Sequence, residues 1–210
     1  MLKKTSSFTS ESRTTLKTLN PTRWSGRILS ISAVKLRYLD IIKSLTEIEL
    51  QSHKKEEREE ASSIKKQMCC FEFVFISTML YKIFTQVNFA SNVLQKKNID
   101  LSESVTVLEQ VEKNLTDLRS SWEILMIEAT ALANKWNIQP EFRQKRQPKV
   151  KKHFDKLLSD YRFNNSQILF KINVFNVVMN RVLTQISNRF RSMKKINKLF
   201  DLLLPKIILS

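Results

Sequence analysis

Glycine is almost absent from this sequence: a single one, Gly26, occurs among 210 residues, together with only four prolines. Sheets that are joined by tight turns use glycine repeatedly, because glycine adopts positive φ angles at little steric cost. Glycine-rich phosphate loops and dinucleotide fingerprints need several glycines at fixed spacing. The scarcity of glycine therefore argues against both kinds of fold and favours long helices.

Residues that bind metals or act as nucleophiles are also scarce. The two histidines, His53 and His153, lie one hundred residues apart, and neither has a cysteine or second histidine at ligand spacing. Cys69 and Cys70 are adjacent, which argues against a disulfide framework and favours a reducing compartment. Their apolar surroundings predict that both are buried in a core helix. We therefore expect no catalytic residue, no metal, no cofactor and no small-molecule substrate.

No apolar run is long enough to span a bilayer. The strongest, residues 68–84, is interrupted by Glu72 and Lys82 and is shorter than the roughly 20 residues that a spanning helix needs. Residues 1–10 lack the apolar core of a signal peptide. We expect neither membrane insertion nor secretion.

Acidic residues are outnumbered, since 20 Asp and Glu face 36 Lys and Arg, for a net charge of +16. Such a surplus favours polyanionic partners, nucleic acid first and anionic membrane second. A solvated surface without a binding role, or a nuclear-localisation signal, would give the same composition. The densest basic segment is a predicted linker, residues 141–164, whose candidate DNA-binding residues are Arg143, Lys145, Arg146, Lys149, Lys151 and Lys152.

Apolar residues recur at three- or four-residue spacing over most of the chain, which predicts an all-α fold, a bundle of long helices. We expect helices over residues 25–49, about 53–94, 102–134 with Ser102 as N-cap, and 165–204. The predicted organisation is a disordered basic tail at 1–20, the first part of the bundle at 21–140, the basic linker, and a basic C-terminal helix with a truncated end at 165–210. The expected buried positions of the first helix are Ile28, Ile31, Leu36, Leu39, Ile42, Leu45 and Ile48, and those of the last are Ile168, Ile172, Phe175, Val178, Val182, Ile186, Phe190, Met193, Ile196 and Phe200.

One short block departs from this pattern, Asn-Pro-Thr-Arg-Trp-Ser at residues 20–25. Arg23 and Trp24 place a planar cation beside a planar ring where an irregular segment meets a helix. This pair is able to bind a phosphate and to stack on a base. A packing role for Trp24 is the alternative.

The block, with Arg27 close by, resembles the Thr-Arg-Trp segment of hAT-superfamily transposases. The resemblance continues in order through Phe-Glu-Phe-Val at 71–74, Leu-Gln-Lys-Lys-Asn-Ile-Asp-Leu at 94–101, the basic run at 143–155 and the helix at 170–200. This order is similar to the subgroup of zinc finger MYM-type protein 1-like proteins. The likeness covers roughly residues 16–205.

The resemblance implies that the chain corresponds to the all-helical domain inserted into an RNase H-like transposase core, with a small remnant of that core at its ends. It also implies that Trp24 stacks on a flipped base. The family's catalytic acids and zinc finger fall outside this chain, so we expect a DNA-binding fragment, inactive alone, that is nuclear or otherwise cytoplasmic. The alternatives are a domesticated protein-interaction module that docks through exposed apolar faces and a basic membrane-surface protein.

Overall fold

The computed structural model describes residues 24–144 and 165–201. Every regular element within these ranges is a helix, so the predicted all-α class is confirmed. The parts of the predicted tail, linker and C-terminal end that fall outside these ranges are not described. The elements are α1 (Trp24–Leu36), α2 (Tyr38–Gln51), α3 (Lys55–Met68), α4 (Phe71–Leu94), α5 (Leu101–Ser120), α6 (Trp122–Lys135), α7 (Ser166–Phe170), the π-helical turn η1 (Lys171–Asn176) and α8 (Val177–Asp201).

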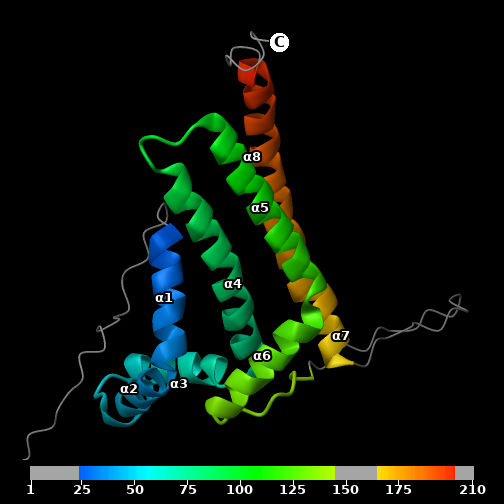
Figure 1. Cartoon of the computed structure of the whole chain (residues 1–210). Coiled ribbons are helices and arrows are strands. Elements are labelled where there is room, and N and C mark those ends of the chain that lie inside the picture. The colour runs from blue at the N-terminus through cyan, green and yellow to red at the C-terminus, as the bar shows by residue number, and fades with distance from the viewer. Residues whose placement is uncertain (1–23, 145–164, 202–210) are drawn as a thin grey trace, which may run out of the picture.

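Four helices, α1, α4, α5 and α8, lie side by side in that order, and each runs antiparallel to its neighbour (Figure 1). At one end of this row α2 packs against α3, and α6 crosses beneath α4. We call this end the base. The opposite end, where α4 turns into α5, is the open end of the row.

The main hydrophobic core lies toward the base and is centred on aromatic rings. Phe75 of α4 packs 4.7 Å from Trp122 of α6 and 5.4 Å from Phe170 of α7, measured between ring centroids. Phe142 lies 4.6 Å from Phe170, and Phe175 lies 5.1 Å from Trp122. Burying each such ring contributes about 2–3 kcal/mol. The cluster therefore ties together four segments that are distant in the sequence.

A second, smaller cluster holds the upper parts of α5 and α8 together. It consists of Val105 and Leu108 from α5 and Phe190 from α8, with Leu94 and Met193 packed against it. Its few side chains bury much less apolar surface than the main core.

Three of the predicted helices are shorter than expected, because each is broken near its middle. The breaks fall at Arg37, at Cys69–Cys70 and at Ser121. At Arg37 the backbone leaves the helical region (φ −114°, ψ 24°), and the next residue, Tyr38, turns into the core. Apolar periodicity does not reveal such a bend, because the helices on both sides bury residues at the same spacing.

The break at Arg37 also overturns part of the predicted core stripe. Leu36 and Leu39 are 75% and 61% exposed, and Ile48 is also exposed. Because the chain changes direction after α1, the faces of α1 and α2 no longer align. The stripe is therefore not continuous across the two helices.

The π-helical turn η1 explains a second error in the predicted core. A π turn takes in more residues than an α turn, so the buried side of α8, which includes Met179 and Phe190, continues backward through Phe175 to Phe170. Ile168 and Ile172 fall out of phase and are exposed. Ile196, also expected to be buried, is exposed near the far end of α8.

Helix α4 is long and apolar enough to cross a membrane by length and composition alone. A core helix meets the same criteria, and eight residues of α4 are buried within the molecule. The feature is therefore weak as an indicator of membrane insertion.

Candidate functional site

The predicted DNA-binding residues do not gather at one place in the part of the chain that the structure describes. Trp24 begins α1 at the open end, whereas Arg143 lines a cavity together with Tyr38, which lies just beyond the other end of α1. A helix of 13 residues separates the two by about 20 Å. Arg23, Lys145, Arg146, Lys149, Lys151 and Lys152 lie outside the described residues.

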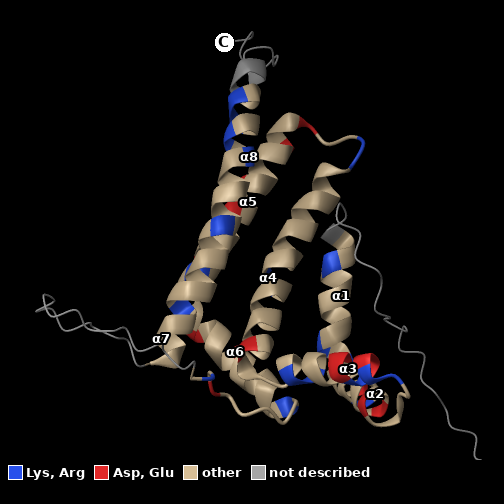
Figure 2. Ribbon diagram, turned by 180° about the vertical axis from the view of Figure 1, so that it is seen from behind, with Lys and Arg blue, Asp and Glu red and all other residues tan. Residues whose placement is uncertain are grey.

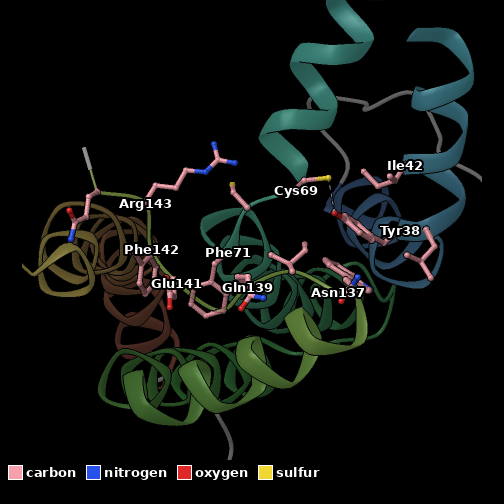
Figure 3. A pocket seen from close by; sticks show the side chains of 14 residues that line it. Tyr38, Ile42, Cys69, Phe71, Asn137, Gln139, Glu141, Phe142 and Arg143 are labelled. Atoms are coloured by element: carbon pink, nitrogen blue, oxygen red, sulfur yellow. Dashed lines mark hydrogen bonds between the residues drawn. The ribbon is translucent and has the colours of Figure 1, made fainter. Parts of the chain in front are cut away.

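The Arg143 cavity has a volume of about 640 Å³. It opens between the start of α2, the junction of α3 with α4, and the segment that follows α6 (Figure 3). Its wall includes Tyr38 and Trp136, the two cysteines and Phe142. Residues from three parts of the chain therefore meet here.

Tyr38 lines one side of this cavity. Its ring stacks on Trp136 with centroids 4.0 Å apart and planes 8° from parallel. Its hydroxyl lies 3.3 Å from the carbonyl oxygen of Met68 and 3.5 Å from Sγ of Cys69. Burial raises the pKa of Tyr38 well above that of a free phenol, and the hydrogen bond with Cys69 raises it further. The phenol therefore stays protonated and links α2 to the end of α3.

The two cysteines occupy the break between α3 and α4, and the prediction that they are buried on a core helix is wrong. Cys69 is exposed and Cys70 is half-buried. The thiol of Cys70 donates to the carbonyl oxygen of Gln67 at 3.0 Å. Burial raises the pKa of Cys70, partly offset by the backbone N–H of Phe73. A protonated thiol is a poor nucleophile, so Cys70 is not prepared for covalent catalysis.

The side chain of Arg143 is used to join helices. Its Nη2 donates to the carbonyl oxygen of Lys66 at 3.1 Å, in the last turn of α3, where carbonyl groups lack helical partners. Its backbone N–H donates to Glu72 Oε1 at 2.7 Å, while Oε2 of that carboxylate is buried without a hydrogen-bond partner. Arg143 thus closes the segment after α6 onto α3 and α4. No three His, Cys, Asp or Glu side chains converge to hold a metal among the described residues.

The segment after α6 is shaped by a left-handed residue that the sequence analysis missed. Asn137 has φ 57°. The N–H of Ile138 donates to the carbonyl of Ala133 at 2.9 Å, and that of Asn137 to the carbonyl of Asn134 at 3.2 Å. These two bonds form a Schellman motif, in which Asn often replaces glycine. The signal in the sequence was the Asn before Ile138, which ends an apolar periodic run.

The basic side of α8 is the other candidate site, and its residues all belong to one helix. Arg181, Arg189, Arg191 and Lys195 are exposed, and none forms an ion pair with a described residue. Lys194 points toward α5 instead, where it pairs with Glu109 at 2.7 Å. Ser187 likewise donates to Glu112 of α5. Figure 2 shows basic residues along the length of α8, whereas the ribbon of α4 is almost free of charge.

No protein-family model, no curated protein and no solved structure matches this chain.

Proposed function

We propose that this chain is a non-enzymatic DNA-binding module, derived from the helical insertion domain of a hAT-type transposase. The transposase origin is supported by the ordered motifs in the sequence. DNA binding is supported by the distribution of charge over the fold, which is the observation that carries the proposal.

Charge divides sharply along the chain. Residues 24–144, which include α1 to α6, hold sixteen Lys and Arg and sixteen Asp and Glu, so their net charge is zero. Residues 165–201 hold seven Lys and Arg and a single acid, Asp201. The basic surplus of the described residues therefore lies on one continuous helix rather than over the whole surface.

The geometry of α8 suits a phosphate backbone. Arg181 and Lys195 are fourteen residues apart, which corresponds to about 21 Å along a helix. Phosphates follow one another every 3.4 Å along the axis of each DNA strand, and binding them releases condensed counterions. Glu109 of α5 pairs with Lys194, whereas the exposed arginines Arg181, Arg189 and Arg191 form no ion pair with a described residue and remain available for a ligand.

A salt titration of DNA binding tests this proposal. Four phosphate contacts by Arg181, Arg189, Arg191 and Lys195 would contribute about −3.6 to the slope of log K against log salt for duplex DNA. Changing all four residues to Gln is expected to weaken binding and to make the slope shallower by about that amount. Fluorescence anisotropy with a labelled 20-base-pair duplex, at salt concentrations from 50 to 300 mM, measures both quantities.

The control changes three residues to Gln: Lys54, the N-cap of α3, and Lys55 and Arg58 in its first turns. These residues are also exposed, but Lys54 and Lys55 pair with Glu57 and Glu59, and acids surround them in the sequence. The control is expected to bind DNA as the parent does. Equal losses in both variants, or a salt-independent affinity, would contradict the proposal.

A second candidate function is a protein-interaction module, which is favoured by exposed apolar side chains. They include Leu36 and Leu39 at the α1–α2 break, Leu50, and Ile124 and Ile127 on α6. Neighbouring apolar residues on a surface mark interaction sites more often than isolated ones do. A folded chain that fails to bind DNA at 50 mM salt would favour this candidate.

A further inference from the structure

A second cavity, of about 420 Å³, opens between α4, α5 and α6. We call it the α4–α5 cavity. It shares no lining residue with the Arg143 cavity, and its volume lies within the range of small-ligand pockets. It is lined by Tyr81, Lys82, Thr85 and Gln86 of α4, by Asn114, Asp117 and Leu118 of α5, and by Ser121, Ile124 and Leu125.

A chain of hydrogen-bonded amide side chains fixes the orientation of the Gln86 amide on the α4 side of the cavity. Gln110 Nε2 donates to Asn114 Oδ1 at 2.7 Å, and Asn114 Nδ2 donates to Gln86 Oε1 at 2.9 Å. With its oxygen occupied in this way, Gln86 presents its NH₂ group as a donor.

The α5 side of the cavity presents an acceptor. Asp117 follows Asn114 by three residues on α5, so the two side chains lie on one face of the helix, about 5–6 Å apart at Cβ. Asp117 is exposed and has no ion-pair partner among the described residues. Its carboxylate therefore remains available to accept hydrogen bonds.

Part of the remaining lining is apolar or aromatic, and Lys82, Thr85 and Ser121 are polar. Leu118, Ile124 and Leu125 contribute aliphatic surface, and the Tyr81 ring borders the cavity. The ammonium group of Lys35 lies 4.3 Å from the centroid of that ring. Lys82 is fixed by Glu128 at 2.7 Å. The cavity thus combines an aromatic wall, an amide donor and a carboxylate acceptor.

We propose that the α4–α5 cavity binds guanine. The carboxylate of Asp117 accepts from the two adjacent donors of guanine, N1–H and the C2 amino group, while the NH₂ group of Gln86 donates to O6 and Tyr81 contacts the ring. The other bases fit poorly. Adenine and cytosine place an acceptor nitrogen beside their amino group, and thymine places carbonyl oxygens on both sides of its N–H, so each sets a lone pair against the carboxylate.

Arg119 does not line this cavity and faces the basic helix α8 instead. It lies between Asp117 and Ser121 on α5, and its Nε donates to Asn180 Oδ1 of α8 at 2.6 Å, one residue before Arg181. Guanine in the cavity would come either from a free nucleotide or from an unpaired base of a strand, and only the second source rests on the proposed function.

The test compares ligands that differ in one base. Twelve-residue thymine oligonucleotides with a single central guanine, adenine or cytosine are titrated by anisotropy, and GMP and AMP by calorimetry. The guanine ligand is expected to bind about tenfold more tightly than its counterparts, the discrimination typical of a bidentate base contact. Asp117→Asn is expected to remove the preference for guanine and to favour xanthine, whose C2 carbonyl accepts from the new amide.

The control variant Glu123→Gln removes an exposed acid that does not line the cavity, and it is expected to keep the guanine preference. If GMP binds more tightly than AMP and the guanine oligonucleotide binds more tightly than its counterparts, the cavity is a nucleotide site. If only the oligonucleotides show the preference, the cavity binds an unpaired base of a strand. If the chain binds GMP but no DNA, the cavity proposal stands and the proposed function is overturned. Equal affinity for all bases, with salt-dependent DNA binding intact, would overturn the cavity proposal alone.

Discussion

At the scale of single residues, Tyr38 makes the stability of the fold depend on pH. Because burial raises its pKa in the folded state, the folded chain keeps the phenolic proton at a pH where the unfolded chain, with an ordinary pKa near 10, has lost it. The stability that Tyr38 contributes is therefore fully present below about pH 10 and falls as the pH rises above it.

The loss of stability at high pH leads to a prediction for Tyr38→Phe. The variant loses the hydroxyl contacts with Met68 and Cys69, so the free energy of unfolding at pH 7 is expected to drop by about 1 kcal/mol. Between pH 9.5 and 11, its stability is expected to fall less steeply than that of the parent. Urea unfolding at several pH values measures both effects. Tyr81→Phe, which changes an exposed tyrosine, is expected to retain the parental slope, and a Tyr38→Phe slope equal to the parental one would contradict the argument.

Asn137 gives a second residue-scale prediction. Its φ of 57° costs most residues roughly 1–2 kcal/mol, which Asn tolerates better and glycine avoids. Asn137→Ala is expected to lower the free energy of unfolding by about 1 kcal/mol, whereas Asn137→Gly should be close to neutral. Thermal and urea unfolding compare the two. A glycine variant as unstable as the alanine variant would show that the Asn side chain, rather than its backbone conformation, matters.

At the scale of elements, the start of α5 distinguishes a true helix cap from an expected one. The sequence predicted Ser102 as N-cap, but Asp100 occupies that position, and its side chain accepts from the N–H of Glu103. Asp100→Ala is expected to lower the free energy of unfolding by about 1 kcal/mol, because the N–H of Glu103 loses its acceptor and a favourable negative charge at the helix start is removed. Ser102→Ala serves as the matched control and is expected to change stability by a few tenths of a kcal/mol at most. A larger loss of stability in Ser102→Ala than in Asp100→Ala would instead support Ser102 as the N-cap.

The elements that could be predicted from sequence are those set by local periodicity. The helical character of α4 and α5 follows from apolar residues at three- and four-residue spacing, and the all-α class follows from the lack of glycine. The breaks at Arg37 and Cys69–Cys70 could not be predicted, because they depend on a distant partner. Tyr38 turns inward to stack on Trp136, almost a hundred residues away, and no local pattern encodes that contact.

The candidate sites follow the same division. The basic side of α8 was visible in the sequence because it belongs to one helix. The use of Arg143 as a link between α3 and α6 was not visible, since it requires the carbonyl of Lys66 and the carboxylate of Glu72. The α4–α5 cavity was missed for this reason too, because Gln86 and Asn114 come into contact only when α4 and α5 pack side by side.

At the scale of the whole molecule, packing and charge are distributed unequally. The aromatic core ties together the base, where α4, α6, α7 and the segment after α6 meet. The open end depends on the small cluster around Phe190 and on the polar links from Glu109 and Glu112 to α8. The basic side of α8 therefore extends from the firmly packed base to the more weakly held end.

The weaker packing at the open end predicts that local unfolding begins there. In hydrogen exchange, the amides of α8 near Phe190 are expected to exchange faster than those near Met179, because opening the upper half of α8 exposes only the small cluster. Phe175→Ala should cost about 3–5 kcal/mol, as is typical for a fully buried phenylalanine. Phe190→Ala should cost less, about 2 kcal/mol, because its neighbours relax more easily. The Phe190 variant is expected to accelerate exchange mainly in the upper parts of α5 and α8 and to leave the base protected. Uniform acceleration along α8, or equal losses of stability in the two variants, would show instead that the row of helices unfolds as one cooperative unit.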